Sequence, residues 1–167
     1  MDRILAAAVA IVLGLLAMGT VGYAAHQAFS QNTVSNVTQG LSLIVTNARS
    51  QFTQSSSAYA DFTTGQTANM ITAGIFPSKW VSGGVAVDPW GNSVTMAPTG
   101  VGNSQAEMTI GGGGSETASQ CEGVVQSFED YVSLNVGGTT FTQTNMPTPT
   151  TAAAACAGTP TLQITFQ

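Results

Sequence analysis

Few side chains in this chain of 167 residues are of types that carry out acid–base, nucleophilic or metal chemistry. His26 is the only histidine, and the two cysteines, Cys121 and Cys156, are far apart in the sequence. A metal site needs several convergent ligands, and a catalytic nucleophile needs a base and an orienting group beside it. Three aspartates are spread through predicted turns: Asp61, Asp88 and Asp130. The sequence therefore predicts no enzyme, no metal site and no cofactor.

The composition combines many apolar residues with very few charges. Hydrophobic residues make up 43% of the chain and charged residues only 7%, where about 25% is usual in soluble domains. Three basic residues against eight acidic ones give a net charge of −5, so direct nucleic-acid binding is not expected. The mean hydropathy of +0.21 argues against disorder. A surface built from hydroxyls, amides and glycine is suited to packing against copies of the same chain.

The N-terminal segment at 4–22, ILAAAVAIVLGLLAMGTVG, carries no charge. At 1.5 Å per residue, a helix of this length spans a hydrocarbon core of about 30 Å. Two simpler interpretations compete with a functional membrane helix: a cleaved secretory signal and a plain one-span anchor. The residues that follow distinguish among these possibilities.

An apolar stripe continues directly after this segment. Its members recur at steps of three and four: Val34, Val37, Leu41, Ile44, Val45, Ala48 and Phe52. Because no proline occurs before Pro77, we expect one continuous helix of about 50 residues, apolar all round in its first half and amphipathic in its second. Glycines within it, such as Gly40, are interpreted as close-packing points between helices or, alternatively, as hinges.

The remaining chain predicts a globular head made of short helices and strands. The expected elements are a short helix capped by Thr67, a hairpin of 85–87 and 94–96, a strand at 106–110, an amphipathic helix capped by Ser115, a hairpin of 132–136 and 139–142, and a final strand at 162–166. The stretch 146–159 is rich in Pro, Thr and Ala and is interpreted as a loop. The pattern predicts an α+β protein with one head on a helical stalk, divided into 1–28 (apolar half-helix) and 29–167 (head with the amphipathic half-helix).

Cys121 and Cys156 are predicted to form a disulfide. A chain with a membrane-type N-terminus places its head in an oxidising compartment, where paired cysteines persist. The alternative is two buried free thiols.

The segment ITAGIFPSKWVSGGVAVDPWGNSVTMAP, at 71–98, resembles a known family. It is similar to the type IV pilins of the type IVb subclass, specifically the PilS kind found with conjugative thin pili, and DPWGNSV is the sharpest part of the match. The resemblance implies a long N-terminal helix packed on an antiparallel sheet. It also equates Cys121 and Cys156 with the two cysteines of the family's disulfide-bonded C-terminal region.

One position departs from the family pattern. Pilins usually begin with a methylated apolar residue and carry Glu at the fifth position, whose carboxylate meets the terminal amine of a neighbour; here position 5 is Leu5. Three explanations remain open: Met1 is not the mature start, Asp2 takes over the pairing, or the charge match is absent. Asp2 could equally pair with Arg3 near the helix N-terminus.

The resemblance implies a structural subunit that leaves the bacterial inner membrane, with the help of a pilus assembly machinery, to join an extracellular filament of identical copies. Such a fimbrium would serve adhesion, conjugation or motility. Its core would bury these side chains: Ile4, Leu5, Val9, Ile11, Val12, Leu13, Leu15 and Leu16. The alternatives are a minor pilin, a secretion-system pseudopilin, or a membrane-anchored recognition module whose contacts would include Trp80, Trp90 and Tyr131.

Overall fold

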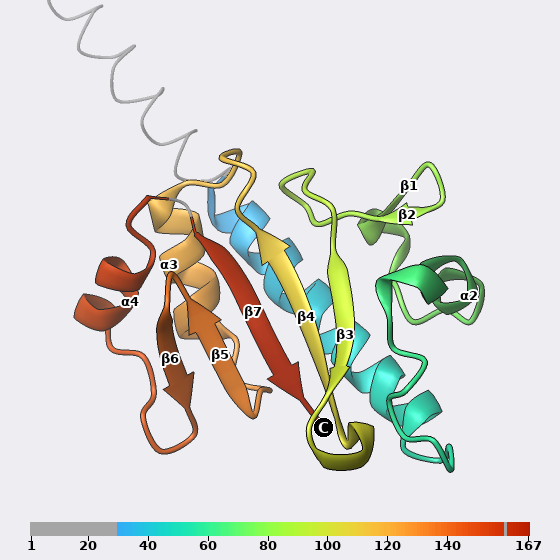
Figure 1. The fold of residues 1–167 in the computed structure, drawn as a ribbon. Helices are drawn as coiled ribbons and strands as arrows, with labels where there is room; N and C mark the ends of the chain where they lie inside the picture. Colours follow the sequence, from blue (N-terminus) through green and yellow to red (C-terminus); the bar gives the residue numbers. More distant parts are fainter. Residues whose placement is uncertain (1–29, 159) are drawn as a thin grey trace, which may run out of the picture. The chain divides into compact units, whose positions relative to one another are not determined.

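The computed structural model describes residues 30–158 and 160–167. The chain divides into two compact units, Met1–Asn32 and Thr33–Gln167, and the second is the head described below. The head contains a long helix, several short helices and an antiparallel sheet, which is the expected α+β arrangement (Figure 1).

A long helix at 30–52 packs one face into the core of the head. The predicted stripe is confirmed, because its five central members are completely buried: Val37, Leu41, Ile44, Val45 and Ala48. Val34 and Phe52, at the two ends of the stripe, are partly buried against the same core. Each fully buried Leu or Ile side chain contributes about 1.5–3 kcal/mol, so this stripe holds the helix on the head.

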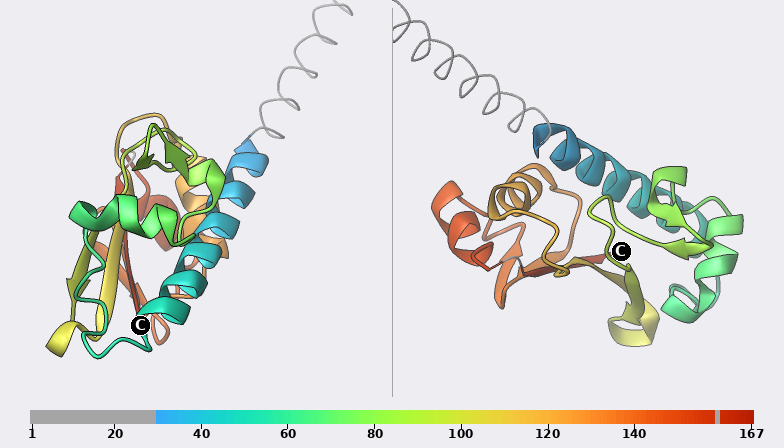
Figure 2. Two further views of the ribbon diagram at one scale, coloured as in Figure 1. Left: turned by 90° about the vertical axis from the view of Figure 1, so that its right-hand side faces the viewer. Right: turned by 90° about the horizontal axis from the view of Figure 1, so that it is seen from above.

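The head contains a five-stranded antiparallel sheet with the order β3-β4-β7-β5-β6. The strands are β3 (Thr95–Thr99), β4 (Gln105–Gly111), β5 (Ser133–Val136), β6 (Thr139–Thr142) and β7 (Thr161–Phe166). The last strand of the chain is therefore the central one, where Ile164 lies opposite Met108 of β4 and Leu134 of β5. The long helix and α3 cover the same face of this sheet (Figure 2). The predictions of β4, of the β5–β6 hairpin and of β7 are confirmed.

The segment between the long helix and the sheet holds α2 (Thr67–Thr72), β1 (Val81–Ser82), β2 (Val85–Ala86) and two short 3-10 helices, η1 (Thr64–Gln66) and η2 (Ser78–Trp80). The predicted hairpin of 85–87 and 94–96 is only partly correct. β2 pairs with β1, whereas β3 pairs with β4 over five positions. A single bridge between Val87 and Ser93 remains of the predicted pairing, because β4 offers β3 a longer partner that buries Met96.

The short helix α2 begins at the expected residue without the expected cap. Gln66 precedes the helix and makes no side-chain capping bond, while the Thr67 hydroxyl donates to the Thr64 carbonyl. Met70 and Ile75 are buried, whereas Ala68 is exposed. Thr67 therefore stabilises the preceding 3-10 turn and does not cap the helix.

The second amphipathic helix, α3 (Ala118–Ser127), starts later than predicted. Thr117, not Ser115, caps it in a reciprocal capping box with Gln120. The helix approaches the long helix closely at Gly123, where a Cβ would lie 2.9 Å from a methyl group of Val34. Glycine at this position thus allows the two helices to pack together.

The stretch predicted as a loop contains a helix, α4 (Pro149–Ala155). Thr148 caps it in a capping box with Thr151, proline occupies its first turn, and an alanine run follows. Each of these features favours the start or the interior of a helix. The prediction of a loop was therefore wrong because it relied on the overall composition and not on the order of these residues.

Candidate functional site

The two cysteines are joined by a disulfide that links α3 to α4. The sulfur atoms of Cys121 and Cys156 are 1.99 Å apart and the Cα atoms 5.7 Å apart, and both residues are fully buried. The predicted pairing is confirmed. The bond closes a loop with a sequence separation of 35 that includes β5, β6 and α4, and it makes this C-terminal region one covalently closed unit.

The DPWGN turn at 88–92 is organised by a carboxylate inside it. Asp88 is only 2% exposed, and its Oδ1 accepts hydrogen bonds from the backbone N–H groups of Trp90 and Asn92, both at 2.9 Å. Its Oδ2 accepts from the N–H of Gly111 at 2.8 Å. One side chain therefore shapes the turn and also ties it to the end of β4. The Asp88 carboxylate is occupied by structural hydrogen bonds and is not free for catalysis.

A second buried carboxylate lies beside the first. Glu116 is also 2% exposed; its Oε1 accepts from the N–H of Gly112, and its Oε2 accepts from the Asn92 side chain at 3.3 Å. The same Asn92 amide group also donates to Asp88 Oδ2 at 3.3 Å. Ser115, predicted as a helix cap, instead donates to the Trp90 carbonyl at 2.7 Å. The DPWGN turn and the glycine-rich loop at 111–114 thus form one polar network.

The aromatic residues considered as recognition contacts lie in the interior. Trp80, Trp90 and Tyr131 are 1%, 9% and 5% exposed, so the structure contradicts a role for these rings as surface contacts. Burial raises the pKa of the Tyr131 phenol above its usual value, and the nearby Glu129 carboxylate raises it further. Within the described residues, no group of three or more His, Cys, Asp or Glu side chains could hold a metal ion.

A comparison with known families decides what these features belong to. Residues 30–167 match the family described as PilS N terminal, which is most of the chain. The chain belongs to the PilS family of type IV pilins. In this PilS-family pilin the DPWGN turn is held by the buried Asp88 carboxylate, which accepts hydrogen bonds from the backbone N–H groups of Trp90 and Gly111.

A solved structure shows the same fold. The PilS-family chain resembles the crystal structure of TcpA, a type IV pilin from Vibrio cholerae El Tor biotype, with a TM-score of 0.58 and 16% identity. The similarity covers 81% of this chain and 99% of the TcpA chain in that crystal structure, so the head has the type IV pilin fold. No curated protein sequence is significantly similar to this chain.

The N-terminal residues predicted to act in assembly lie outside the described residues. They are Met1, Asp2 and Arg3, together with the predicted core positions Ile4, Leu5, Val9, Ile11, Val12, Leu13, Leu15 and Leu16. Their roles in this pilin stay predictions. In the part of the chain that the structure describes, no helix is both long enough and apolar enough to span a membrane.

The surface of the pilin head is acidic and has few cations. Arg49 on the long helix holds Asp130 through Nη1, at 2.7 and 2.8 Å from the two carboxylate oxygens. Lys79 is exposed, and no carboxylate of the described residues lies within 4.0 Å of it; its Nζ donates to Asn36 Oδ1 at 3.3 Å. Lys79 is therefore the cation of the described head that is available to an external anion.

Two cavities open on the surface of the head, each lined by a different set of residues. We call the first the Lys79 groove, a cavity of about 260 Å³ lined by Asn36, Gln39, Gly40, Leu43, Pro77, Ser78, Lys79 and Trp80. The second, the Glu129 hollow, is a smaller cavity of about 100 Å³ lined by Val125, Gln126, Phe128, Glu129, Tyr131, Met146 and Pro147. Leu43 and Met146 are about half exposed, at 51% and 52%. Each feature therefore combines an exposed apolar side chain with a charge, and the two charges are opposite in sign.

Proposed function

We propose that this chain is the repeating subunit of an extracellular type IV pilus, in which identical copies assemble into a helical filament. Its membership of the PilS family and its type IV pilin fold support this function. The low charge of the chain adds to this support, because a surface of weakly repelling polar groups tolerates close contact with copies of itself. The subunit would pass from the inner membrane to the filament with the help of a pilus assembly machinery.

The complementary pair of surface features carries the proposal. The Lys79 groove is lined by the long helix and η2, whereas the Glu129 hollow is lined by the C-terminal end of α3, the residues before β5 and the segment after β6. The groove of one copy would receive Met146 of the next, and Lys79 would pair with its Glu129. Two different patches meeting in this way make a heterologous contact, which propagates into a filament when its rotation does not close.

The apolar segment of the stalk supplies the second contact. We propose that residues 1–28 anchor the subunit in the membrane and then form the filament core, with 29–167 as the head. Outside the membrane, a single subunit would expose this apolar surface to water. Packing the apolar segments of many subunits together buries that surface, which is favourable. Asp2 would meet a terminal amine in this core, in the role that Glu has at position 5 of other pilins.

Fibres sheared from cells and identified by mass spectrometry test the proposed function. We expect this chain to be the main component of filaments seen by electron microscopy, and its first residue to be revealed by the same spectra. Fibres that contain only traces of the chain would contradict the proposal and favour a minor pilin or a pseudopilin.

Charge exchange tests the proposed contact between copies. Lys79→Glu and Glu129→Lys each place like charges opposite one another, so each alone should reduce fibre yield, and the double variant should restore it. Asp61→Lys makes an equal change of charge at an exposed residue outside both features and serves as the control. Normal fibres from both single variants would show that the head contact lies elsewhere.

A further inference from the structure

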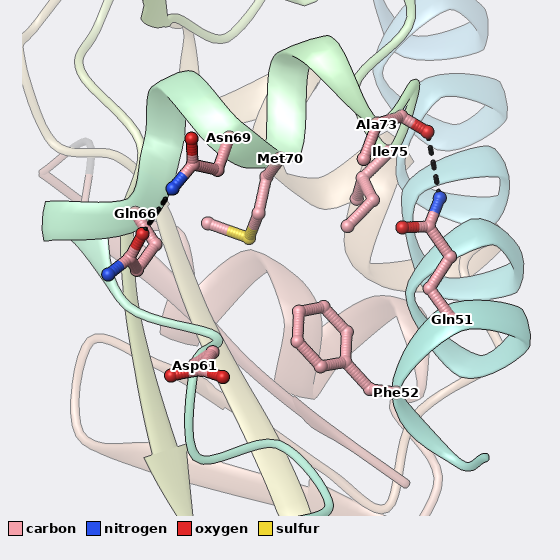
Figure 3. A pocket seen from close by; sticks show the side chains of 8 residues that line it. All are labelled: Gln51, Phe52, Asp61, Gln66, Asn69, Met70, Ala73 and Ile75. Carbon is pink, nitrogen blue, oxygen red and sulfur yellow. Dashed lines mark hydrogen bonds between the residues drawn. The ribbon is translucent and has the colours of Figure 1, made fainter. Parts of the chain in front are cut away.

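A pocket of about 310 Å³ lies between the C-terminal end of the long helix and α2 (Figure 3). Neither the disulfide nor the proposed contact between copies uses it. Its lining comes from the end of the long helix, the loop after it and the segment that contains α2. The lining residues are Gln51, Phe52, Asp61, Gln66, Asn69, Met70, Ala73 and Ile75. The volume is at the lower end of the range of about 300–1,000 Å³ that small-molecule sites occupy.

The inner part of the pocket is apolar. The side chains of Phe52, Met70 and Ile75 point into the same space (Figure 3), and Met70 and Ile75 are buried. The Phe52 ring is fixed by two aromatic neighbours. It meets Phe62 edge-on, with ring centroids 5.8 Å apart, and lies 5.7 Å from the Tyr59 ring. A held aromatic ring gives a ligand a rigid apolar surface at little entropic cost.

The rim of the pocket is polar and offers hydrogen-bond acceptors. Asn69 Nδ2 donates to Gln66 Oε1 at 2.6 Å, and Gln51 Nε2 donates to the Ala73 carbonyl at 2.8 Å. These bonds leave the carbonyl oxygens of Asn69 and Gln51 able to accept from a ligand. Asp61 is exposed and its carboxylate makes no hydrogen bond or ion pair within the described residues.

The walls of the pocket are joined before any ligand arrives. Gln51 ties the long helix to the end of α2, and Asn47 Nδ2 donates to the carbonyls of Gly74 and Ile75 at 3.0 and 3.3 Å. Because both walls are linked by hydrogen bonds, binding would cost little reorganisation.

We propose that this pocket binds one neutral pyranose unit of a glycan. A pyranose presents an apolar C–H face, which would lie on Phe52, and a ring of hydroxyl donors, which would bond to the oxygens of Asp61, Asn69 and Gln51. The unpaired Asp61 carboxylate repels anionic sugars, and the net charge of −5 acts in the same direction. The ligand class is thus a neutral sugar and not a sialylated or uronic one.

Methyl resonances of methionine report on this pocket directly. The full chain, labelled with ¹³C at its methionine methyl groups and held in a detergent without a sugar headgroup, would be titrated with the methyl pyranosides of glucose, galactose, mannose and N-acetylglucosamine. At least one should shift the Met70 signal saturably and leave that of the exposed Met146 unchanged. Methyl glucuronide and sialyllactose should leave Met70 unshifted. The proposal fails if no neutral pyranoside shifts Met70, or if both methionine signals move together.

Rim variants separate a specific site from general adsorption. Asn69→Ala should weaken the binding about 5- to 10-fold, which is the loss expected for one hydrogen bond. Asn135→Ala, which removes an amide on β5, is the matched control and should bind as the unaltered chain does. Asp61→Asn should reduce the discrimination against methyl glucuronide. Unchanged affinity in Asn69→Ala would overturn the assignment, and because dispersed subunits are measured, the result is independent of filament assembly.

Discussion

Gly40 of the long helix lies directly against the indole ring of Trp80. A Cβ atom at position 40 would be 1.9 Å from Nε1 of Trp80 and 2.5 Å from its Cε2. Trp80 is only 1% exposed, so the glycine lets this large ring reach the core between the helix and η2. The sequence predicts a close-packing point between helices at this glycine, whereas its close neighbour in the head is a tryptophan of η2, directly before β1.

Gly40→Ala is expected to destabilise the head by about 1–3 kcal/mol, the usual cost of overpacking a core. Helix propensity alone would predict a more stable variant, because alanine is favoured over glycine by about 1 kcal/mol in a helix. Urea unfolding of the full chain in detergent, followed by Trp fluorescence, measures the difference. Gly65→Ala, where a Cβ would meet nothing closer than 3.8 Å, is the control. A more stable Gly40→Ala variant would contradict the packing argument.

Loss of the disulfide is expected to lower the free energy of unfolding by about 3–4 kcal/mol, given the sequence separation of 35 between Cys121 and Cys156. The reason is that the reduced chain gains freedom in its unfolded state. The urea midpoint of the unaltered chain, measured with and without reductant, checks this value. The double variant Cys121→Ser, Cys156→Ser should behave as the reduced chain does, with no further change on adding reductant. An unaltered chain whose midpoint is the same with and without reductant would argue against a stabilising bond.

Asp88→Ala is expected to lower the free energy of unfolding by about 3 kcal/mol. Its carboxylate accepts from three backbone N–H groups, those of Trp90, Asn92 and Gly111, and the variant leaves these donors without their partner. Asp61→Ala removes an exposed carboxylate without such bonds and should change stability by no more than about 0.5 kcal/mol. Thermal unfolding of both variants provides the comparison. Equal melting temperatures would mean that the turn does not depend on Asp88.

Tyr59 should make the head sensitive to alkaline pH. Burial raises the pKa of its phenol above 10.0, although the Arg49 guanidinium lowers it in part. The unfolded phenol loses its proton near pH 10, before the folded one does. The contribution of Tyr59 to stability is therefore complete below pH 10 and is lost as the pH rises through the folded pKa.

Tyr59→Phe tests this dependence. The Tyr59 hydroxyl is buried and has no hydrogen-bond partner within the described residues, so its removal should keep or raise stability at neutral pH, by about 1 kcal/mol at most. Between about pH 9 and about pH 11 the variant should lose less stability than the unaltered chain. Parallel pH dependences of the two urea midpoints would show that another group controls alkaline unfolding.

Local patterns in the sequence predicted some elements correctly. The stripe from Val34 to Phe52 predicted the buried face of the long helix, because a helical period repeats within a few residues and needs no distant partner. Alternating apolar and polar residues predicted β4, and a Gly-Gly turn between two short segments, 132–136 and 139–142, predicted the hairpin of β5 and β6. The same kind of local signal, at Thr148 and Pro149, was present for α4 but was hidden by a composition typical of loops.

Contacts between distant residues could not be predicted in this way. The sequence predicts a hairpin between β2 and the strand that follows it, but β3 pairs with β4 over five positions instead. The pocket beside α2 likewise depends on bringing Phe52, Asp61 and Met70 together from separate segments. No short sequence pattern predicts that these residues lie together, because they do so only when the helix and the loop after it are packed against each other.

By itself, the sequence determined the amphipathic helix, the strand predicted at 106–110, the pairing of its two cysteines and a resemblance to type IV pilins at 71–98. Only the tertiary structure decided that the last strand, β7, lies at the centre of the sheet, that Trp80 fills the space above Gly40, and that Asp88 reaches the N–H of Gly111. The physical reason is the range of the interactions. Periodicity, capping and turn geometry act between near neighbours, whereas strand order and the partner of a buried side chain depend on how the whole core closes.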